Sequence, residues 1–171
     1  QTALGEDGVK KFPVKQQIHN VAVPRTLKAT LRPYQQKGFS WMVHLHKQGF
    51  GGCLADDMGL GKTLQTLTLL QYIYKPSTPR QPEKFFGHFH LIFTTYGMMR
   101  NNIDILCSYR FEYIVLDESQ NIKNSESLTF RSAIRLQSKH RLVLTGTPIE
   151  NSLKDLWAQF HFIQPDLLGT E

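Results

Sequence analysis

The sequence predicts an α/β fold in which a mostly parallel sheet is covered by helices on both faces. Two observations lead to this prediction. Short apolar runs, which suit buried strands, alternate along the chain with longer segments whose apolar residues recur at helical spacing. In addition, three of the apolar runs end in turns that carry glycine, acidic or hydroxyl side chains. Because ligands of such sheets bind beyond the carboxyl ends of the strands, we expect these three turns to share one edge.

The chain begins with a segment that we expect to carry little chemistry. Residues 1–30 are interpreted as a connector or the tail of an upstream region, since glycine and proline interrupt any periodicity. Residues 31–171 suit a single domain. A helix is predicted over residues 31–45, with Pro33 in its first turn, where no backbone N–H is needed. Near its start, Gln35 could read an adenine edge because a carboxamide offers a donor and an acceptor, although spacing alone favours a solvated helix residue.

Residues 51–70 have the pattern of a strand, a phosphate-binding loop and a helix. The loop reads DDMGLGKT over residues 56–63. Gly59 and Gly61 allow the backbone to curl so that successive N–H groups point at an anion. The helix that follows directs its positive dipole end toward the same place.

The loop also supplies the side chains that a magnesium nucleotide requires. Lys62 is placed to reach the outer phosphates, and the Thr63 hydroxyl could ligand Mg²⁺. Asp57 is included in the candidate cofactor site. The strict phosphate-loop pattern has glycine where this chain has Asp56. The alternative interpretation is therefore a glycine-rich turn whose lysine is solvated.

Three further strands are predicted from apolar runs, at residues 89–96, 112–119 and 141–148. Between and after them, residues 127–137 and 152–163 have helical spacing. The helix after the phosphate loop is expected to bury Leu64, Leu67, Leu70, Ile73 and Tyr74. The last helix is expected to bury Leu153, Leu156, Trp157, Phe160 and Ile163.

The strand predicted at residues 112–119 delivers a pair of acids at its end. Asp117 could hold Mg²⁺, which prefers oxygen ligands. Glu118 could polarise or deprotonate an attacking water. Alone, these acids are equally consistent with the solvation of a loop, but the phosphate loop upstream favours the catalytic interpretation.

The strand predicted at residues 141–148 ends in the sequence LTGTP. Thr145, Gly146 and Thr147 supply hydroxyl groups and a flexible position at this third turn. The hydroxyl groups could hydrogen-bond Glu118 or a neighbouring lobe and so link the nucleotide state to motion. An ordinary turn with threonine caps explains the spacing equally well.

The charge balance favours a polyanionic partner only weakly. The chain has 20 lysine and arginine residues against 14 acidic residues, which gives a net charge of +6 and a pI of about 9.4. The H-E-x-x-H spacing that is typical of one class of zinc site does not occur in the sequence, so a zinc site is not expected. No apolar run approaches the ~20 residues that span a bilayer, so we expect no membrane association. If nucleic acid binds, we expect phosphate contacts to dominate.

Five stretches of the chain resemble successive helicase motifs of Swi/Snf-family DNA-dependent ATPases, within helicase superfamily two. They follow the family's order and cover residues 31–169. The resemblance implies the first RecA-like lobe, with a P-loop, of an enzyme that uses ATP and Mg²⁺. Such an enzyme translocates along double-stranded DNA without strand separation and remodels DNA-bound proteins. The five stretches are LRPYQQKGFSWM, GGCLADDMGLGKTLQTL, LIFTTYG, YIVLDESQNIKN and RLVLTGTPIENSLKDLW.

The resemblance also implies roles for individual residues. Residues 117–120 read DESQ where relatives usually carry DEAH or DEAQ, so Ser119 is a small departure. The implied roles are adenine reading for Gln35, phosphate and Mg²⁺ binding for Lys62 and Thr63, metal binding for Asp117, water activation for Glu118, coupling for Thr145, Gly146 and Thr147, and a position near the DNA backbone for Thr94, Thr95 and Tyr96.

The interval between residues 75 and 88 departs more strongly from the family pattern. The family normally has a strand and a DNA-contacting motif there, and the interval is too short to hold them. We expect that residues are omitted, with a junction near residues 82–86, because deleting a central strand should be severely destabilising. The second RecA-like lobe, with its arginine finger, is also absent from the sequence. Since such a finger raises the rate of hydrolysis by roughly 10³–10⁵-fold, we expect the lobe alone to be nearly inactive.

Two other classes of function stay open from the sequence. A catalytically silent nucleic-acid-binding scaffold would be separated by a nucleotide titration. A helicase that unwinds RNA or DNA would be separated by a strand-displacement assay. A small-molecule kinase is disfavoured, because it would not need LTGTP. The expected location is nuclear in a eukaryote, or nucleoid-associated in the cytoplasm of a bacterium.

Overall fold

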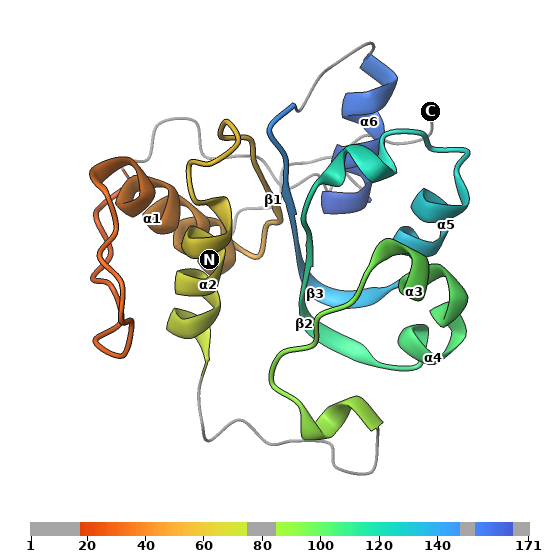
Figure 1. The fold of residues 1–171 in the computed structure, drawn as a ribbon, viewed down its shortest axis with the longest axis horizontal. Coiled ribbons are helices and arrows are strands. Elements are labelled where there is room, and N and C mark those ends of the chain that lie inside the picture. The colour runs from red at the N-terminus through yellow and green to blue at the C-terminus, as the bar shows by residue number, and fades with distance from the viewer. Residues whose placement is uncertain (1–17, 75–84, 148–152, 166–171) are drawn as a thin grey trace, which may run out of the picture.

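The computed structural model describes residues 18–74, 85–147 and 153–165, which fold around one sheet (Figure 1). None of the described helices combines the length and the apolar character needed to cross a membrane. Two of the elements, η1 and η2, are short 3₁₀ helices. In chain order the elements are α1 (Pro33–Gln48), β1 (Gly52–Leu54), α2 (Lys62–Ile73), η1 (Phe85–His88), α3 (Tyr96–Asn101), α4 (Ile103–Cys107), β2 (Arg110–Leu116), η2 (Ser119–Ile122), α5 (Leu128–Arg135), β3 (Gln137–Leu144) and α6 (Leu153–Ile163).

The three strands pair in parallel in the order β1-β3-β2. Leu54 of β1 pairs with Leu144 of β3, and Leu116 of β2 pairs with Val143 of β3. Parallel strands require crossover connections, which helices supply here. The predicted parallel sheet is therefore confirmed.

Helices cover both faces of the sheet, as predicted. Figure 1 shows α1 and α2 on one side and α3 to α6 on the other. Along β3, Leu142 and Leu144 belong to the hydrophobic core under α1 and α2, whereas Val143 belongs to the core under the other helices. This alternation follows from the two-residue period of a strand. Fully burying each such side chain stabilises the fold by roughly 1.5–3 kcal/mol.

Arg141 of β3 holds the ends of two helices against the sheet. Its guanidinium donates to the carbonyl oxygens of Ile134 and Leu136 at the end of α5, at 3.3 and 2.6 Å. It also donates to the carbonyl oxygen of Phe162 in α6, at 3.0 Å. Burial lowers the pKa of Arg141. A cation at the carboxyl ends of helices satisfies carbonyl groups that lack helical partners, so this contact fixes where α5 and α6 lie.

The strand predicted at residues 89–96 is wrong. Residues 89–95 form no regular structure, and Tyr96 begins α3. Phe89, Leu91 and Phe93 are 57%, 49% and 80% exposed. A strand exists only where a neighbouring strand pairs with its backbone, and within the described residues β2 pairs with β3 alone. The apolar run therefore forms no strand in the described part of the chain.

The predicted core faces of α2 and α6 are wrong in part. Leu67 of α2 is 38% exposed, while Thr66 and Leu69 are buried. The Thr66 hydroxyl donates to the carbonyl oxygen of Lys62 one turn earlier, so its burial leaves no unpaired group. In α6, Leu153 is 80% exposed and Gln159 is 1% exposed. The sides that these helices bury are set by the elements against which they pack.

Candidate functional site

The ends of the three strands lie at one edge of the sheet. Leu54 and Leu144 are paired final residues, and Leu116 ends β2 beside Val143. The backbone N–H of Thr145 donates to the carbonyl oxygen of Leu54 at 3.1 Å, which continues this pairing past the strands. Neighbouring strands lie about 4.8 Å apart, so the loops after β1 and β2 begin about 10 Å from each other. The predicted convergence of the three turns is confirmed.

The loop between β1 and α2 curls as its glycine residues predict. Gly59 and Gly61 have φ angles of 80° and 77°, in the left-handed region that favours glycine. Gly61 is also the N-cap of α2. A Cβ atom on Gly61 would lie 2.5 Å from Nε2 of Gln35, whereas one on Gly59 would meet open space. Gly61 is thus required by both conformation and packing, and Gly59 by conformation alone.

Lys62 occupies the inside of this curl. Its ammonium donates to the carbonyl oxygens of Asp56 and Asp57, at 2.7 and 3.0 Å, and the residue is only 9% exposed. The alternative of a solvated lysine is therefore wrong. Thr63, the next residue in the first turn of α2, is exposed. The lysine ammonium and the amino end of a twelve-residue helix together suit an anion, and phosphate binding here stays a prediction.

Gln35 lies against the phosphate loop from α1. Its Nε2 donates to the carbonyl oxygen of Leu60 at 3.0 Å, and its Oε1 accepts from the backbone N–H of Arg32 at 2.9 Å. The hydroxyl of Tyr34 donates to the same Leu60 oxygen at 3.1 Å. Gln35 is 7% exposed, so the alternative of a solvated helix residue is wrong. Its reading of an adenine edge stays a prediction.

Asp56, the departure from the strict loop pattern, is bound by a residue that sequence reasoning missed. Gln65 of α2 is fully buried and its Nε2 donates to Oδ2 of Asp56 at 3.0 Å. The Oε1 atom of Gln65 lies against Gly38 of α1, where any Cβ atom would clash with it. The carboxylate at position 56 thus anchors the start of the loop to α2. A polar residue among the leucines of α2 was the only available signal.

The acid pair follows β2 directly, and both residues are exposed. Glu118 has φ 50° and ψ 54° and is the only non-glycine residue with positive φ in the described parts of the chain. Its backbone N–H donates to Oδ1 of Asp117 at 2.9 Å. The side chain of Gln120 donates to Oε2 of Glu118 at 2.7 Å, which orients that carboxylate. The two acids are therefore held by local hydrogen bonds at the strand end.

Tyr96 connects the start of α3 to this acid pair. Its hydroxyl donates to the carbonyl oxygen of Asp117 at 2.7 Å. Burial raises the pKa of Tyr96, and the negative charges of Asp117 and Glu118 raise it further. Thr95 is the N-cap of α3, since its hydroxyl accepts from the N–H of Met98 at 3.2 Å. Thr94 is exposed. The structure thus brings Tyr96 beside the acids, and the contact of residues 94–96 with DNA stays a prediction.

The third turn lies against the phosphate loop. A Cβ atom on Gly146 would lie 3.1 Å from Cγ and 3.6 Å from the backbone nitrogen of Met58. Thr145 is fully buried, and its Oγ1 accepts from the N–H of Thr147 at 3.1 Å. Lys123, after η2, reaches the hydroxyl of Thr147 at 3.5 Å. The threonine turn therefore contacts the phosphate loop and the segment that follows the acids, while its role in coupling stays a prediction.

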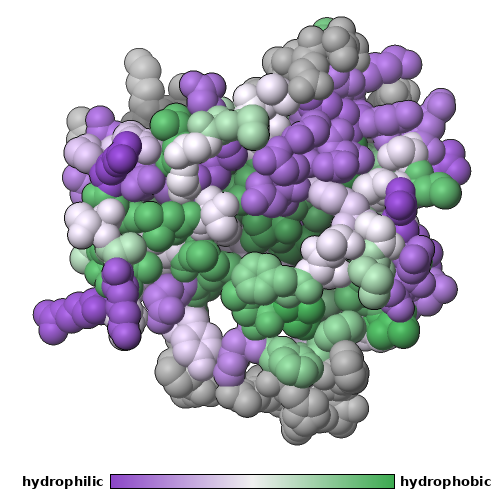
Figure 2. Space-filling model, viewed as in Figure 1, coloured by the Kyte–Doolittle hydropathy of each residue, from purple (hydrophilic) through white to green (hydrophobic). Residues whose placement is uncertain are grey.

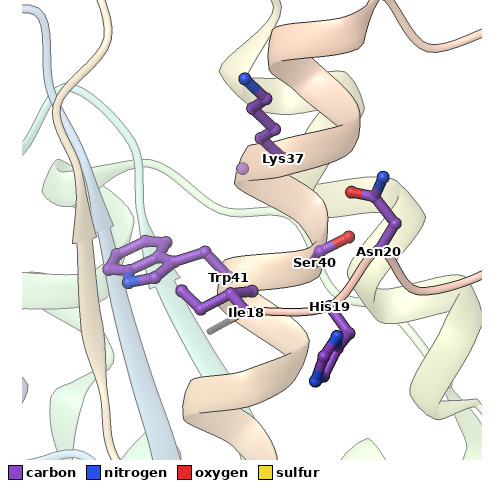
Figure 3. A pocket seen from close by; sticks show the side chains of 7 residues that line it. Ile18, His19, Asn20, Lys37, Ser40 and Trp41 are labelled. Carbon is purple, nitrogen blue, oxygen red and sulfur yellow. The ribbon is translucent and has the colours of Figure 1, made fainter. Parts of the chain in front are cut away.

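A separate hollow of about 680 Å³ lies between α1 and the residues that precede it (Figure 3). The hydroxyl of Ser40 is already bonded to the N–H of Val21 and to the carbonyl oxygen of Gln36. Figure 3 shows the Lys37 side chain extending away from Ile18 and Trp41. Because its polar groups do not converge, this hollow has no part in the site at the sheet edge.

Comparison with known proteins agrees with this geometry. The family model of the SNF2-related domain matches residues 34–84 and 74–171. The chain is 34% identical to the chromatin-remodeling ATPase INO80 of Lodderomyces elongisporus, over 88% of this chain and 13% of that protein. It is 35% identical to the TATA-binding protein-associated factor MOT1 of Saccharomyces cerevisiae, over 87% of this chain and 11% of that protein. The chain therefore spans only a small part of these relatives.

A solved structure also resembles the fold. The Sulfolobus solfataricus SWI2/SNF2 ATPase core in complex with dsDNA matches with a TM-score of 0.73 and 37% identity. The match covers 91% of this chain and 39% of that chain. At this identity the likeness extends beyond the arrangement of helices and strands to the sequence that forms them.

The alignments contain more positions than this chain supplies. The match to the Lodderomyces protein runs over 200 positions but includes 88% of the 171 residues here, which is about 150. About 50 positions of that alignment (200 minus 150) are thus without a residue of this chain. The two parts of the family match meet at residues 74–84, between α2 and η1.

Proposed function

The chain belongs to the family of SNF2-related domains, and we propose that it is the first RecA-like lobe of an ATPase that moves along double-stranded DNA and remodels protein–DNA complexes. One observation carries this proposal. A phosphate loop with its lysine inside the curl and a strand-end acid pair lie at the same sheet edge, separated by the threonine turn that contacts the loop.

The residues at this edge fit Mg²⁺ and ATP. The curl of Gly59 and Gly61, the Lys62 ammonium and the amino end of α2 would hold the phosphates. The exposed Thr63 hydroxyl and Asp117 carboxylate are oxygen donors of the kind that Mg²⁺ prefers. When bound, the metal would neutralise part of the negative charge on the phosphates. Gln35 and Asp57 complete the proposed nucleotide-binding set.

Glu118 would perform the proton transfer of hydrolysis. Its carboxylate accepts the proton of the attacking water, and a positioned base of this kind contributes typically 10²–10⁴ in rate. The hydrogen bond from Gln120 limits the directions in which that carboxylate can point. Lys62 would stabilise the negative charge that develops on the transferred phosphate.

Double-stranded DNA is the proposed polymer partner. The Sulfolobus core, which resembles this chain, was solved in complex with dsDNA. The net charge of +6 favours a polyanion. Tyr96 is bonded to the backbone of Asp117, so contact of Thr94, Thr95 or Tyr96 with the DNA backbone would be sensed at the hydrolytic site. Thr145, Gly146 and Thr147 would pass the change to a second RecA-like lobe, and the fungal relatives support a nuclear location.

Phosphate release by the full-length protein tests this function. We expect ATP turnover to rise strongly when double-stranded DNA is added and to stay low without it. A protein that binds no ATP would instead support the silent scaffold. Strand displacement on a partial duplex would support the unwinding helicase. Equal turnover with and without every duplex would overturn the proposal.

We also propose that a segment of about 50 residues belongs between α2 and η1. The unmatched positions of the INO80 alignment support its length, and the split of the family match at residues 74–84 supports its position. The exposed run of Phe89, Leu91 and Phe93 supports this, because apolar side chains in a strand-like run are normally covered. In Figure 2 hydrophobic side chains gather at the centre of the face where Figure 1 shows this run passing β2. The inserted residues would supply the strand that pairs with it.

A chimera tests the inserted segment. The corresponding residues of the Lodderomyces INO80 protein are placed between α2 and η1, and Phe93→Ala is compared in the chimera and in the chain as printed. We expect the substitution to destabilise the chimera by about 1.5–3 kcal/mol more, because the segment would bury the ring. An equal effect in both proteins would show that the segment does not cover this run.

A further inference from the structure

The residue after Glu118 forms a buried hydrogen bond that reaches far along the chain. Ser119 is fully buried, and its hydroxyl donates to Oε1 of Gln159 in α6 at 2.9 Å. Gln159 is itself only 1% exposed. Ser119 is the position at which this chain differs from the DEAH and DEAQ motifs that it resembles. Those motifs have alanine there, so the hydroxyl that bonds to the buried Gln159 belongs to the residue in which this chain departs from them.

The backbone that this hydrogen bond holds is strained. Glu118 adopts the left-handed conformation, which side chains with a Cβ atom disfavour. Such a conformation persists only where the surroundings over-determine it. The side chain and the backbone N–H of Asn121 donate to the carbonyl oxygen of Glu118, at 2.8 and 3.1 Å. These contacts are local and would move together with the turn.

The Ser119–Gln159 hydrogen bond differs because it connects the turn to another element. The carbonyl ends of α6 and α5 are held to the sheet by Arg141. Ile122, at the other end of η2, is fully buried in the core under these helices. The start of η2 is thus tied to α6 by a hydrogen bond, and its end is held by packing.

We propose that Ser119 and Gln159 are positioning residues that hold the Glu118 carboxylate in its productive direction through their buried hydrogen bond. The inference rests on the proposed function of Glu118. Neither residue faces the sheet edge with its own side-chain polar group, since each is bonded to the other inside the protein. They act on the reaction only through the backbone of the turn.

The test uses the full-length protein with double-stranded DNA and compares Ser119→Ala, Gln159→Leu and the double variant. Ser119→Ala removes the hydroxyl that donates to Oε1 of Gln159, Gln159→Leu removes the acceptor of that hydroxyl, and the double variant removes both groups of this hydrogen bond. We expect kcat to fall about tenfold in all three, because small misplacement of a catalytic group is costly. KM for ATP should change less than about twofold, since the phosphate loop is untouched. The melting temperature should fall in the single variants and recover in the double variant.

Recovery of melting temperature without recovery of kcat is the result that a merely structural hydrogen bond would not give. A double variant with normal kcat would overturn the positioning role, as would single variants with normal kcat. Ser40→Ala is the matched control, because Ser40 is 1% exposed, forms hydrogen bonds within the α1 region and is not at the sheet edge. We expect it to leave kcat unchanged.

Amide hydrogen exchange over residues 118–121 supplies a readout that does not depend on activity. We expect exchange there to accelerate about tenfold in Ser119→Ala and in the double variant, and to stay unchanged in Ser40→Ala. Absence of turnover in the wild-type protein would overturn the proposed function itself. In that case the exchange rates alone would test whether this hydrogen bond holds the turn. Rates in the variants equal to those of the wild-type protein would show that it does not.

Discussion

At the carboxyl edge of the sheet three loops contact one another, whereas along the segment 89–95 apolar side chains are exposed. At the edge, Lys62 donates to carbonyl groups of its own loop, and Gly146 lies against Met58 of that loop. Phe93, by contrast, is 80% exposed. Both regions contain apolar runs that are followed by polar residues.

The difference between the two regions lies in their neighbours. β1 has only three residues, yet it forms a strand because β3 pairs with it. The seven residues 89–95 have a longer apolar run and form no strand. A strand is stabilised by the backbone hydrogen bonds and cross-strand contacts of its partner. Strand formation is therefore a property of a pair of strands.

The largest effect is expected at the carboxyl edge, from Glu118→Gln in the full-length protein. The amide cannot accept the proton of the attacking water, so turnover should fall about 10²–10⁴-fold. ATP should still bind, as a titration would measure. Glu112→Gln is the matched control, because Glu112 is an exposed acid of the same β2 strand, paired with Lys139. Normal turnover in Glu118→Gln would mean that the acid pair is not hydrolytic.

The two regions should also differ in their contribution to stability. Phe39 is fully buried, and the centroid of its ring lies 5.8 Å from that of Tyr72. Phe39→Ala should therefore lower the free energy of unfolding by about 3–5 kcal/mol. Phe93→Ala in the chain as printed should change that free energy by less than about 0.5 kcal/mol. Denaturant unfolding measures both. Similar losses would mean that residues 89–95 pack as a core strand does.

A smaller effect is expected from a glycine of the carboxyl edge. Gly61→Ala in the phosphate loop should destabilise the protein by about 1–2 kcal/mol, because alanine is strained at a positive φ. The new Cβ atom would also push against Gln35. Gly97→Ala in α3 is the control, since its Cβ atom would meet nothing nearer than 3.9 Å. If both variants unfold at the same denaturant concentration as wild type, the curl does not depend on Gly61.

The smallest effect is expected from a change of pH, which should alter the stability of the fold through a histidine on the α1 side of the sheet. His140 of β3 stacks on Tyr113 at 4.8 Å and lies 4.5 Å from His46. Burial lowers the pKa of His140 below its usual 6.5, and the neighbouring His46 and Lys139 lower it further against the opposing charge of Glu112. The unfolded chain therefore takes up this proton first, and stability should fall as the pH falls through about 6.5.

His140→Phe keeps a ring for stacking and removes the titrating group. Urea unfolding at about pH 7.5 and about pH 5.5 should show a smaller loss of stability in this variant than in wild type. His19→Phe is the control, because His19 is exposed before α1. A loss of the same size in wild type and in His140→Phe would mean that another group causes the pH dependence.

The sequence by itself predicted which turns meet at one edge of the sheet. Glycine at positions 59 and 61 allows the positive φ angles that a curled loop requires, and apolar runs that end in acids or threonine indicate strands that end at a candidate site. These signals are local, because they depend on the conformations that each residue type allows. They were sufficient for the α/β class, the parallel sheet and the placing of Lys62, Thr63, Asp117 and Glu118 at one edge of that sheet, while the chemical roles of these residues stay predictions.

Only the tertiary structure decided which apolar and polar side chains are buried. Leu67 and Phe93 are exposed, while Gln65, Ser119 and Gln159 are inside. A helix or strand pattern fixes the spacing of a face, but the partner that covers the face comes from distant parts of the chain. A buried glutamine is stable only where a second polar group meets it, as Asp56 meets Gln65 and Ser119 meets Gln159. The meeting of Ser119 and Gln159 is set by packing, because these two residues lie 40 positions apart along the chain.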